Sequence, residues 1–277
     1  MKFSILCPID FTKVSLVAFA HALKLTILLG AKLTILCLET PNRSLKYISN
    51  YPPVIATLMR WGILSEDLEL QSLFSKLGIA VRKRHRKCFS PHTAIVDYLR
   101  DHQVDLIVLS IHSPKNGVPH GITSIVFELI QQDHDLQSLF LPVSSVGFVS
   151  ILDGSVTLRN ILVPMAAEPS PQSAIEDAVA LASTAGNDST EITLMHVGTQ
   201  EGMPKIELPA SDRCQCNSII RSGGVVDELT SFPSDHSTDL VVMTTRVRKS
   251  SKHSHSSGLT AQVLEKIPCP VLTIPVP

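Results

Sequence analysis

Three apolar blocks occur twice in this chain, in the same order. The pairs are residues 5–10 (ILCPID) and 161–166 (ILVPMA), residues 95–99 (IVDYL) and 225–229 (VVDEL), and residues 105–109 (DLIVL) and 239–243 (DLVVM). The second copies follow 130–156 residues after the first. This distance is far too long for a solenoid repeat, and it is long enough for each copy to be a domain with its own core. The repetition therefore predicts a duplicated domain whose halves can be compared position by position.

The composition fits two ordinary globular domains without a strong charge bias. Of the 277 residues, 44% are hydrophobic and 18% are charged, and the formal net charge is -1. A chain of this length and hydrophobic content can bury two cores. Because neither charge is in large excess, we expect no nucleic acid and no membrane surface as a partner.

The N-terminal sequence does not have the pattern of a signal peptide. Pro8 and Asp10 come too early to allow a signal-peptide apolar core. The longest apolar stretch, residues 14–29, contains His21 and Lys24 and is too short to cross a bilayer. The six cysteines are scattered along the chain, which is typical of reduced thiols. We therefore expect a cytoplasmic protein.

The alternation of apolar runs with helical segments predicts an α/β fold with two doubly wound parallel sheets of five strands each. In the first half we expect strands at residues 2–10, 32–38, 81–88, 105–110 and 139–143, helices at 15–29, 91–102 and 124–132, and a long helix-compatible segment at 53–77. In the second half we expect strands at 160–164, 191–197, 218–221, 239–244 and 271–274, and helices at 171–185, 225–232 and 259–267.

The predicted domains cover residues 1–145 and 160–277, with a linker at 146–159. Gly202, Pro204 and Pro209 interrupt the interval in which the second domain would carry its second helix. We therefore expect that the second domain lacks this helix.

Several motifs of the chain resemble the universal stress protein family in its tandem, two-domain form. They are the Pro-x-Asp after the first strand (Pro8-Ile9-Asp10), the strands at 105–109 and 239–243, and the ending AQVLEKIPCPVL at residues 261–272. The resemblance implies five-stranded, adenine nucleotide alpha hydrolase-like domains that form a pseudo-dimer within one chain. It also implies that the final strands, 139–143 and 271–274, pair or pack near the pseudo-twofold axis.

Nucleotide-binding members of that family carry the signature Gly-x2-Gly-x9-Gly-Ser/Thr after the fourth strand. Its four positions correspond to Ser110, Ser113, Thr123 and Ser124 in the first half, and to Thr244, Val247, Ser257 and Gly258 in the second. None of the three glycine positions holds a glycine in either half. Where such a position needs a positive φ, a side chain costs about 1 kcal/mol or more. Hydroxyl and backbone N–H groups can still hold an anion, so we expect weakened nucleotide binding.

The first half is the better candidate for a nucleotide site. Asp10 lies where the family places an acid near the adenine and ribose, and its counterpart in the second half is Ala166. Asp10 could also cap the following helix. The candidate residues are Pro8, Ile9, Asp10, Ser110, His112, Ser113, Thr123 and Ser124 in the first half, and Thr244, Arg246, Arg248, Ser257 and Gly258 in the second. The resemblance implies ATP or AMP as the ligand; otherwise we expect no cofactor.

Other polar clusters have two interpretations each. The basic run at residues 82–87 is either an anion patch or a charged edge strand, and we favour the edge strand. The loop at 246–255 is either a phosphate-binding loop or a solvated surface loop. Cys214 and Cys216 could ligate a metal together with His253 and His255, but a free pair is the preferred interpretation. Trp61 and Phe74 are expected to pack their segment against the sheet.

No catalytic motif and no metal-binding motif is present in the sequence. The leading hypothesis is a non-catalytic stress-response sensor or scaffold with weak nucleotide binding. The alternatives are an ATP- or AMP-binding protein with slow ATP hydrolysis in the first domain, and a partner-binding module that uses residues 53–77. The partner protein stays unknown, and the chain is expected to be a pseudo-twofold monomer or a homodimer.

Overall fold

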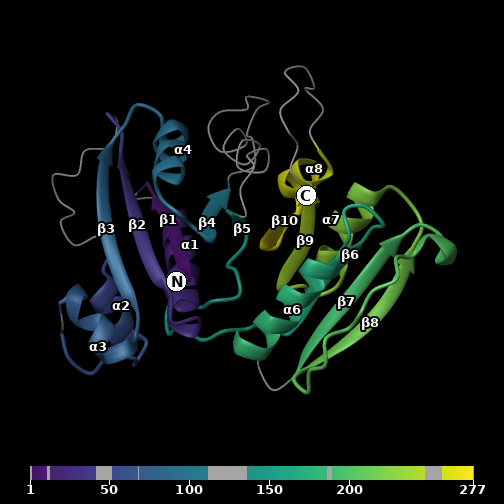
Figure 1. The fold of residues 1–277 in the computed structure, drawn as a ribbon, viewed down its shortest axis with the longest axis horizontal. Helices are drawn as coiled ribbons and strands as arrows, with labels where there is room; N and C mark the ends of the chain where they lie inside the picture. The colour runs from purple at the N-terminus through teal and green to yellow at the C-terminus, as the bar shows by residue number, and fades with distance from the viewer. Residues whose placement is uncertain are drawn as a thin grey trace. The chain divides into compact units, whose positions relative to one another are not determined.

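The computed structural model describes residues 2–10, 13–41, 52–67, 69–111, 136–185, 189–246 and 258–276 (Figure 1). The chain divides into two compact units. The first consists of Met1–Ser110 with Val149–Ser155, and the second of Ile111–Phe148 with Val156–Pro277. The predicted helix at 124–132 lies outside the described residues. The domain boundaries and the pseudo-dimer drawn from the sequence stay predictions.

Four parallel strands form the sheet of the first unit in the order β3-β2-β1-β4. They are β1 (Ser4–Ile9), β2 (Lys32–Glu39), β3 (Ala80–Lys87) and β4 (Leu106–Ile111). Helix α1 (Lys13–Leu28) connects β1 to β2, and α4 (Pro91–Asp101) connects β3 to β4. Helix α4 begins where the sequence predicts, because Pro91 occupies its first turn and Ser90 Oγ accepts a hydrogen bond from Thr93 N at 3.3 Å.

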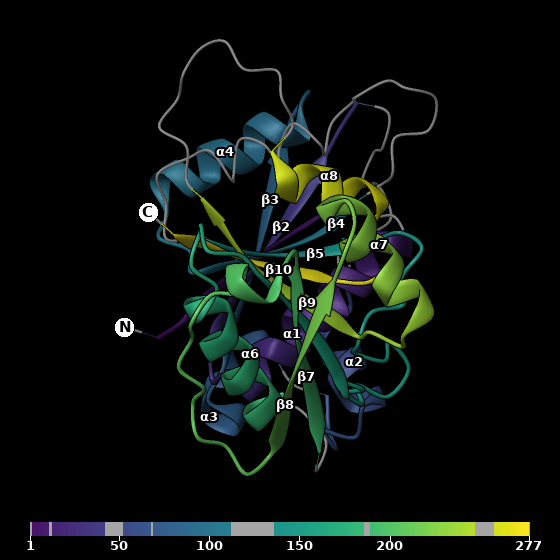
Figure 2. The ribbon, with the colours of Figure 1, turned by 90° about the vertical axis from the view of Figure 1, so that its right-hand side faces the viewer.

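The second unit repeats this plan. Its five parallel strands have the order β10-β9-β6-β7-β8, and β7 and β8 run side by side (Figure 2). The strands are β6 (Asn160–Met165), β7 (Thr190–Val197), β8 (Cys214–Arg221), β9 (Leu240–Arg246) and β10 (Val271–Val276). The helices are α6 (Gln172–Ala185), α7 (Val225–Asp235) and α8 (Leu259–Lys266).

The strand that ends the first half of the sequence, β5 (Gln137–Pro142), pairs with β10 in antiparallel orientation inside the second unit. Leu139 lies opposite Leu272, and Phe140 lies opposite Val271. Phe140 is fully buried, so this pairing contributes to the core. The expectation that the two final strands pair is confirmed.

The strand orders confirm the predicted α/β fold with doubly wound parallel sheets. In each half the first strand lies between the second and the fourth, so successive strands are added first on one side of it and then on the other. Strand β1 pairs with β2 at six positions but with β4 only at Ile5–Leu106 and Leu6–Ile107. Likewise, β6 pairs with β9 only at Ile161–Leu240 and Leu162–Val241. Because this pairing stops near the amino ends, the carboxyl ends separate at both topological switch points, where such folds bind ligands.

The two halves differ most in the connection between their second and third strands. In the first half, residues 52–79 contain α2 (Val54–Arg60), a 3₁₀ turn (Leu70–Ser72) and α3 (Leu73–Leu77). In the second half, residues 198–213 contain only a 3₁₀ turn (Gln200–Gly202), followed by extended chain. The extended chain lies along α6, where Gln172 Nε2 donates to Glu207 O at 2.9 Å and Glu207 N donates to Gln172 Oε1 at 3.0 Å.

The turn at Val149–Ser155 belongs to the first unit because it binds two helices there. On α1, the fully buried His21 accepts a hydrogen bond from Val149 N at Nε2 (3.1 Å), and its Nδ1 lies 2.8 Å from Val17 O. Beside α2, Trp61 Nε1 donates to Ile151 O at 3.4 Å. The sequence predicted that Trp61 packs inward, and it is buried. The same expectation was wrong for Phe74, which is 57% exposed and lies under the Lys2 ammonium.

Within the described residues, no helix is long and apolar enough to cross a membrane.

Candidate functional site

In each half, an aspartate at the amino end of the fourth strand accepts hydrogen bonds from the backbone at the start of the first strand. In the first half, Asp105 Oδ2 accepts a hydrogen bond from Ser4 N at 2.7 Å, and Asp105 N donates to Ser4 O at 2.9 Å. In the second half, Asp239 Oδ2 accepts from Arg159 N at 2.7 Å and from Asn160 N at 2.8 Å. These bonds tie the first strand to the fourth at their starts. The repeated Asp of the two DL blocks is therefore a framework residue in both halves.

At the first switch point, Asp10 lies at the carboxyl end of β1, the strand next to β4. Pro8 and Ile9 are buried in β1, and Asp10 follows directly as a half-buried carboxylate. If the register of Leu6 and Ile107 is continued toward the carboxyl ends, Ile9 lies level with Ser110, which is also half-buried. An acid and a hydroxyl therefore lie at the ends of adjacent strands. His112, Ser113, Thr123 and Ser124 lie outside the described residues.

The second switch point has a different set of side chains. Continuing the register of Leu162 and Val241 places Met165 level with Thr244. Ala166 is exposed at the position equivalent to Asp10, and Thr244 is 9% exposed. At the end of β9, Arg246 forms an ion pair of 2.6 Å with Glu168 from the loop after β6. Arg246, a candidate phosphate ligand from the sequence, is thus already paired with a carboxylate of its own chain.

The start of α8 contributes an N-terminus to the second switch point. Gly258 is its N-cap residue and provides no side-chain cap. Thr260, in the first turn, pairs its hydroxyl with that of Thr245 on β9 at 3.1 Å, and both side chains are buried. These two hydroxyls fasten α8 to β9. Helix N-termini attract anions, but the basic side chain at the end of the strand that holds this helix, Arg246, is already paired with Glu168. Arg248 and Ser257 lie outside the described residues.

The thiols beneath the first switch point are not nucleophiles. Cys7 on β1 and Cys37 on β2 are both buried. Burial raises the pKa of Cys7 far above its usual value, and the neighbouring Cys37 raises it further. Burial also raises the pKa of Cys37 to about 11, although the charge of Lys83 opposes this change. Both groups are therefore neutral thiols that fill the core.

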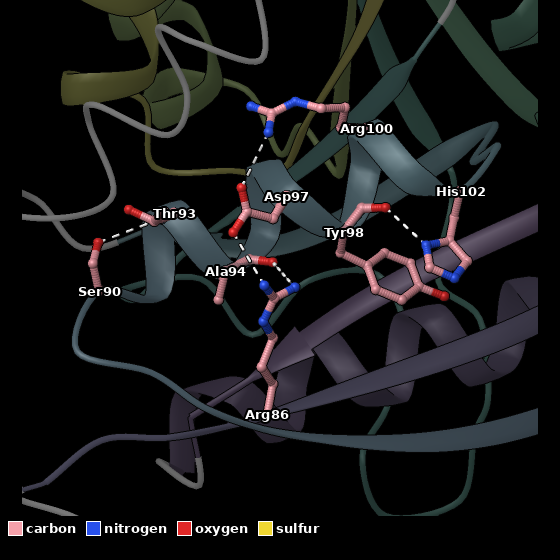
Figure 3. Close-up of polar contacts among 8 residues, drawn as sticks. All are labelled: Arg86, Ser90, Thr93, Ala94, Asp97, Tyr98, Arg100 and His102. Carbon is pink, nitrogen blue, oxygen red and sulfur yellow. Dashed lines mark hydrogen bonds and ion pairs between the residues drawn. The ribbon is translucent and has the colours of Figure 1, made fainter.

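The basic run of residues 82–87 forms most of β3, which lies at the end of the sheet as the sequence predicted. Figure 3 shows how α4 neutralises part of this charge. Asp97 accepts hydrogen bonds from Arg86 at 3.0 Å and from Arg100 at 3.4 Å, and Arg86 also reaches Ala94 O at 3.5 Å. One turn further, the rings of Tyr98 and His102 stack at 4.0 Å. These contacts favour the interpretation as a charged edge strand.

No group of three or more His, Cys, Asp or Glu side chains that could hold a metal ion occurs in the described part of the chain. Cys214 and Cys216 lie on β8, where the sequence placed only a strand at 218–221. His253 and His255, which sequence analysis considered as further ligands, lie outside the described residues.

Two residues near the second switch point, Glu168 and His196, were not predicted from the sequence. Glu168 was not identified because its partner, Arg246, is 78 residues away in the chain. His196, at the end of β7, is buried, and its Nδ1 lies 2.9 Å from Met165 O. Its Nε2 would be only 2.8 Å from a Cβ at Gly198 and 3.3 Å from one at Gly202. Gly198 and Gly202 therefore leave the room that the imidazole needs. This packing could not be predicted from the sequence.

Residues 1–122 match the family described as the universal stress protein family. No curated protein matches the sequence. Among solved structures, a universal stress protein from Archaeoglobus fulgidus DSM 4304 has a TM-score of 0.58 at 14% identity, with 98% of each chain covered. A functionally unknown protein, PA1789 from Pseudomonas aeruginosa PAO1, has a TM-score of 0.62 at 12% identity, with 99% of this chain and 92% of the other covered. At these identities the structural matches show a shared fold.

Proposed function

We propose that this chain, whose residues 1–122 match the universal stress protein family, acts in the cytoplasm as a non-catalytic sensor or scaffold that binds ATP or AMP weakly, and only in its first half. The observation that carries this proposal is the contrast between the two switch points. The first has a carboxylate, Asp10, directly after β1 and a hydroxyl, that of Ser110, near the end of the adjacent strand β4. The second has Ala166 in place of the acid and an internal Arg246–Glu168 pair.

The chemistry of the first switch point fits part of an adenosine ligand. A half-buried carboxylate can accept hydrogen bonds from ribose hydroxyls or from an adenine amine. The Ser110 hydroxyl can donate to a phosphate or ribose oxygen. The side chains that replace the signature glycines leave less room for backbone contacts to the phosphates. We therefore expect that ATP and AMP bind weakly, and that contacts to their adenosine part contribute most of the affinity.

The chemistry of the second switch point argues against a nucleotide there. A phosphate that approached Arg246 would have to displace the Glu168 carboxylate, which lies 2.6 Å from the guanidinium. An exposed pair of this kind has a small interaction energy, but a second anion beside Glu168 is repelled by it. Without an acid at position 166, nothing at that position replaces the contacts that Asp10 offers.

Thermal unfolding of the whole chain with ATP or AMP, with and without Mg²⁺, tests the proposal. At millimolar nucleotide near the dissociation constant, we expect an upward shift of about 1–2 °C. Asp10→Ala should abolish the shift. The matched control is Asp212→Ala, which removes an exposed carboxylate at the amino end of β8 and should keep the shift.

Two results would contradict the proposal. One is the absence of any shift at millimolar nucleotide, which excludes a nucleotide role. The other is a shift that survives Asp10→Ala but disappears in Arg246→Ala, which moves the site to the second half. Release of phosphate from Mg²⁺-ATP that depends on Asp10 would favour the alternative of slow ATP hydrolysis over the non-catalytic function.

A further inference from the structure

The second half carries two thiols side by side on an edge strand. Cys214 and Cys216 are two residues apart on β8, which is the last strand of the sheet. Side chains two residues apart on a strand point to the same face. Both cysteines are half-buried, and burial together with the neighbouring Cys214 raises the pKa of the Cys216 thiol. The two thiols are therefore close enough to interact.

Contacts on β8 identify the face that carries the thiols. Arg221 lies with its guanidinium 5.5 Å from the ring of Phe232 on α7, so the odd-numbered residues of β8 point toward α7. Asn217 shares this side and donates to Glu191 Oε1 at 2.9 Å. The thiols point to the opposite face, where Thr190 and Ile192 of β7 lie level with them in the parallel register.

Without a second helix in this half, both thiols stay half-buried on this face. In the first half, the register equivalents of the thiols are Ile79 and Val81, which are both buried. Val81 pairs with Leu33, the partner of Ile5, as Cys216 pairs with Ile192, the partner of Ile161. There, α3 and the 3₁₀ turn before it contact β3. In the second half, the corresponding connection at residues 198–213 has no helix and lies along α6 instead.

The thiol pair has the geometry for a two-coordinate ion. Adjacent same-face positions on a strand are about 6.7 Å apart along the chain. Two metal–sulfur bonds of about 2.3 Å each span about 4.6 Å, a distance that the sulfurs can reach by leaning together. A disulfide needs Cβ atoms about 3.5–4.5 Å apart, so β8 would have to leave its strand conformation. Within the described residues no third His, Cys, Asp or Glu joins the pair, whereas structural zinc requires four ligands.

From this geometry we propose that Cys214 and Cys216 bind a single soft monovalent cation, Cu(I) or Ag(I), between two thiolates. Soft thiolate ligands select such ions, and two ligands suffice for their linear coordination. On binding, each thiol releases its proton to solvent, and the ion forms two sulfur bonds, which leaves one net negative charge on the complex. The buried thiols of Cys7, Cys37 and Cys269 do not compete, because solvent does not reach them.

Competition for Cu(I) tests this proposal. The reduced, full-length chain is titrated into Cu(I) held by a coloured bathocuproine chelate, with excess glutathione present so that isolated thiols cannot retain the ion. We expect about one Cu(I) per chain. Cys214→Ser and Cys216→Ser should each lower the affinity about 100-fold or more, because the chelate is lost. Cys88→Ser, which removes a half-buried single thiol of the first unit, should leave binding unchanged.

A relocated thiol provides the sharper control. The double variant Cys216→Ser with Asn217→Cys keeps the number of thiols but moves one to the α7 side of β8, so it should lose the ion as the single variants do. X-ray absorption at the copper edge should show two sulfur neighbours in the unmodified chain. The proposal is overturned if the relocated variant retains the affinity, if Cys88→Ser loses it, or if the copper has three or more sulfur neighbours.

Discussion

The two switch points share their amino ends and differ at their carboxyl ends. Asp105 and Asp239 make equivalent hydrogen bonds to the start of the first strand in each half. At the carboxyl ends, the first half has Asp10, whereas the second half has Ala166 at the equivalent position and the Arg246–Glu168 pair nearby in the chain. The residues that hold the strands together are thus retained after duplication, whereas the residues that could hold a ligand are not. The difference teaches that a duplicated fold is no reason to expect a duplicated site.

The largest effect should come from the shared framework. Asp239→Ala removes the acceptor of two backbone N–H groups, from Arg159 and Asn160. Asp105→Ala removes the acceptor of Ser4 N. Bonds to a charged acceptor contribute more than neutral ones, so we expect losses of about 3 kcal/mol for Asp239→Ala and about 1.5 kcal/mol for Asp105→Ala. Urea unfolding measures both. If either variant is as stable as Asp212→Ala, that aspartate is not a framework residue.

The next effect concerns His21 on α1, whose counterpart on α6 is Asp177. Burial lowers the pKa of His21 from 6.5 to about 4. Because the folded pKa lies below the unfolded one, protonation favours unfolding. The stability that depends on neutral His21 is fully present above about pH 6.5 and is lost as the pH falls toward about 4. Relative to His21→Gln, the unmodified chain should lose about 2 kcal/mol between pH 7.5 and pH 5.

The Gln side chain can still accept from Val149 N, which makes it the suitable replacement for His21. Urea unfolding at several pH values gives the slopes, and His102→Gln, at the exposed end of α4, is the control. A pH slope in His21→Gln equal to that of the unmodified chain would show that His21 does not govern acid stability.

A smaller effect is expected from opening the second switch point. Glu168→Ala frees Arg246 at the end of β9, the strand to which Thr260 of α8 is hydrogen-bonded. Release of an exposed ion pair is nearly neutral for stability. The free guanidinium should nevertheless raise the affinity of the second half for ATP about fivefold. Calorimetry in the Asp10→Ala background isolates this gain. The control is Glu201→Ala, which removes an exposed acid of the same half. An equal gain in affinity there would show that the effect comes from the change in net charge.

The smallest effect is at Asp177, 156 residues after His21 and on the corresponding helix. Burial raises the pKa of this half-buried carboxyl, Glu176 raises it further, and the bond from Gln137 opposes the change. A raised folded pKa means that stability is lost as the pH rises through it, opposite in sign to His21. Asp177→Asn should therefore stabilise the chain at pH 7 by a few tenths of a kcal/mol, after solvent screening. The gain should vanish near pH 3.5; a gain that persists there would refute the assignment.

Much of this fold is predictable from sequence because its strands are continuous apolar runs. The PID and DL blocks mark the strands beside each switch point, and the alternation with helices implies the parallel order. Asp10 could be found because it follows such a strand directly, and Ser110 because it lies near the end of one. The start of β8 could not, since Cys214 to Ser218 carries little apolar signal. Phe74 was assigned to the core by its size, although it lies exposed under Lys2.

The partners of the second switch point were not predictable for a different reason. Glu168 and Arg246 meet only when the loop after β6 and the end of β9 come together. Likewise, His21 accepts a hydrogen bond from the backbone N–H of Val149, which is 128 residues away in the chain. No local pattern encodes such contacts. Duplication helps only in showing where to compare, because it aligns Asp10 with Ala166 and His21 with Asp177.

Photolabelling with an azido-adenosine triphosphate, followed by proteolysis and mass spectrometry, tests the one-sided nucleotide site most directly. Label confined to peptides from residues 1–122, and absent in Asp10→Ala, is the predicted result. Label of equal intensity on peptides that contain Thr244 or Gly258 would contradict it.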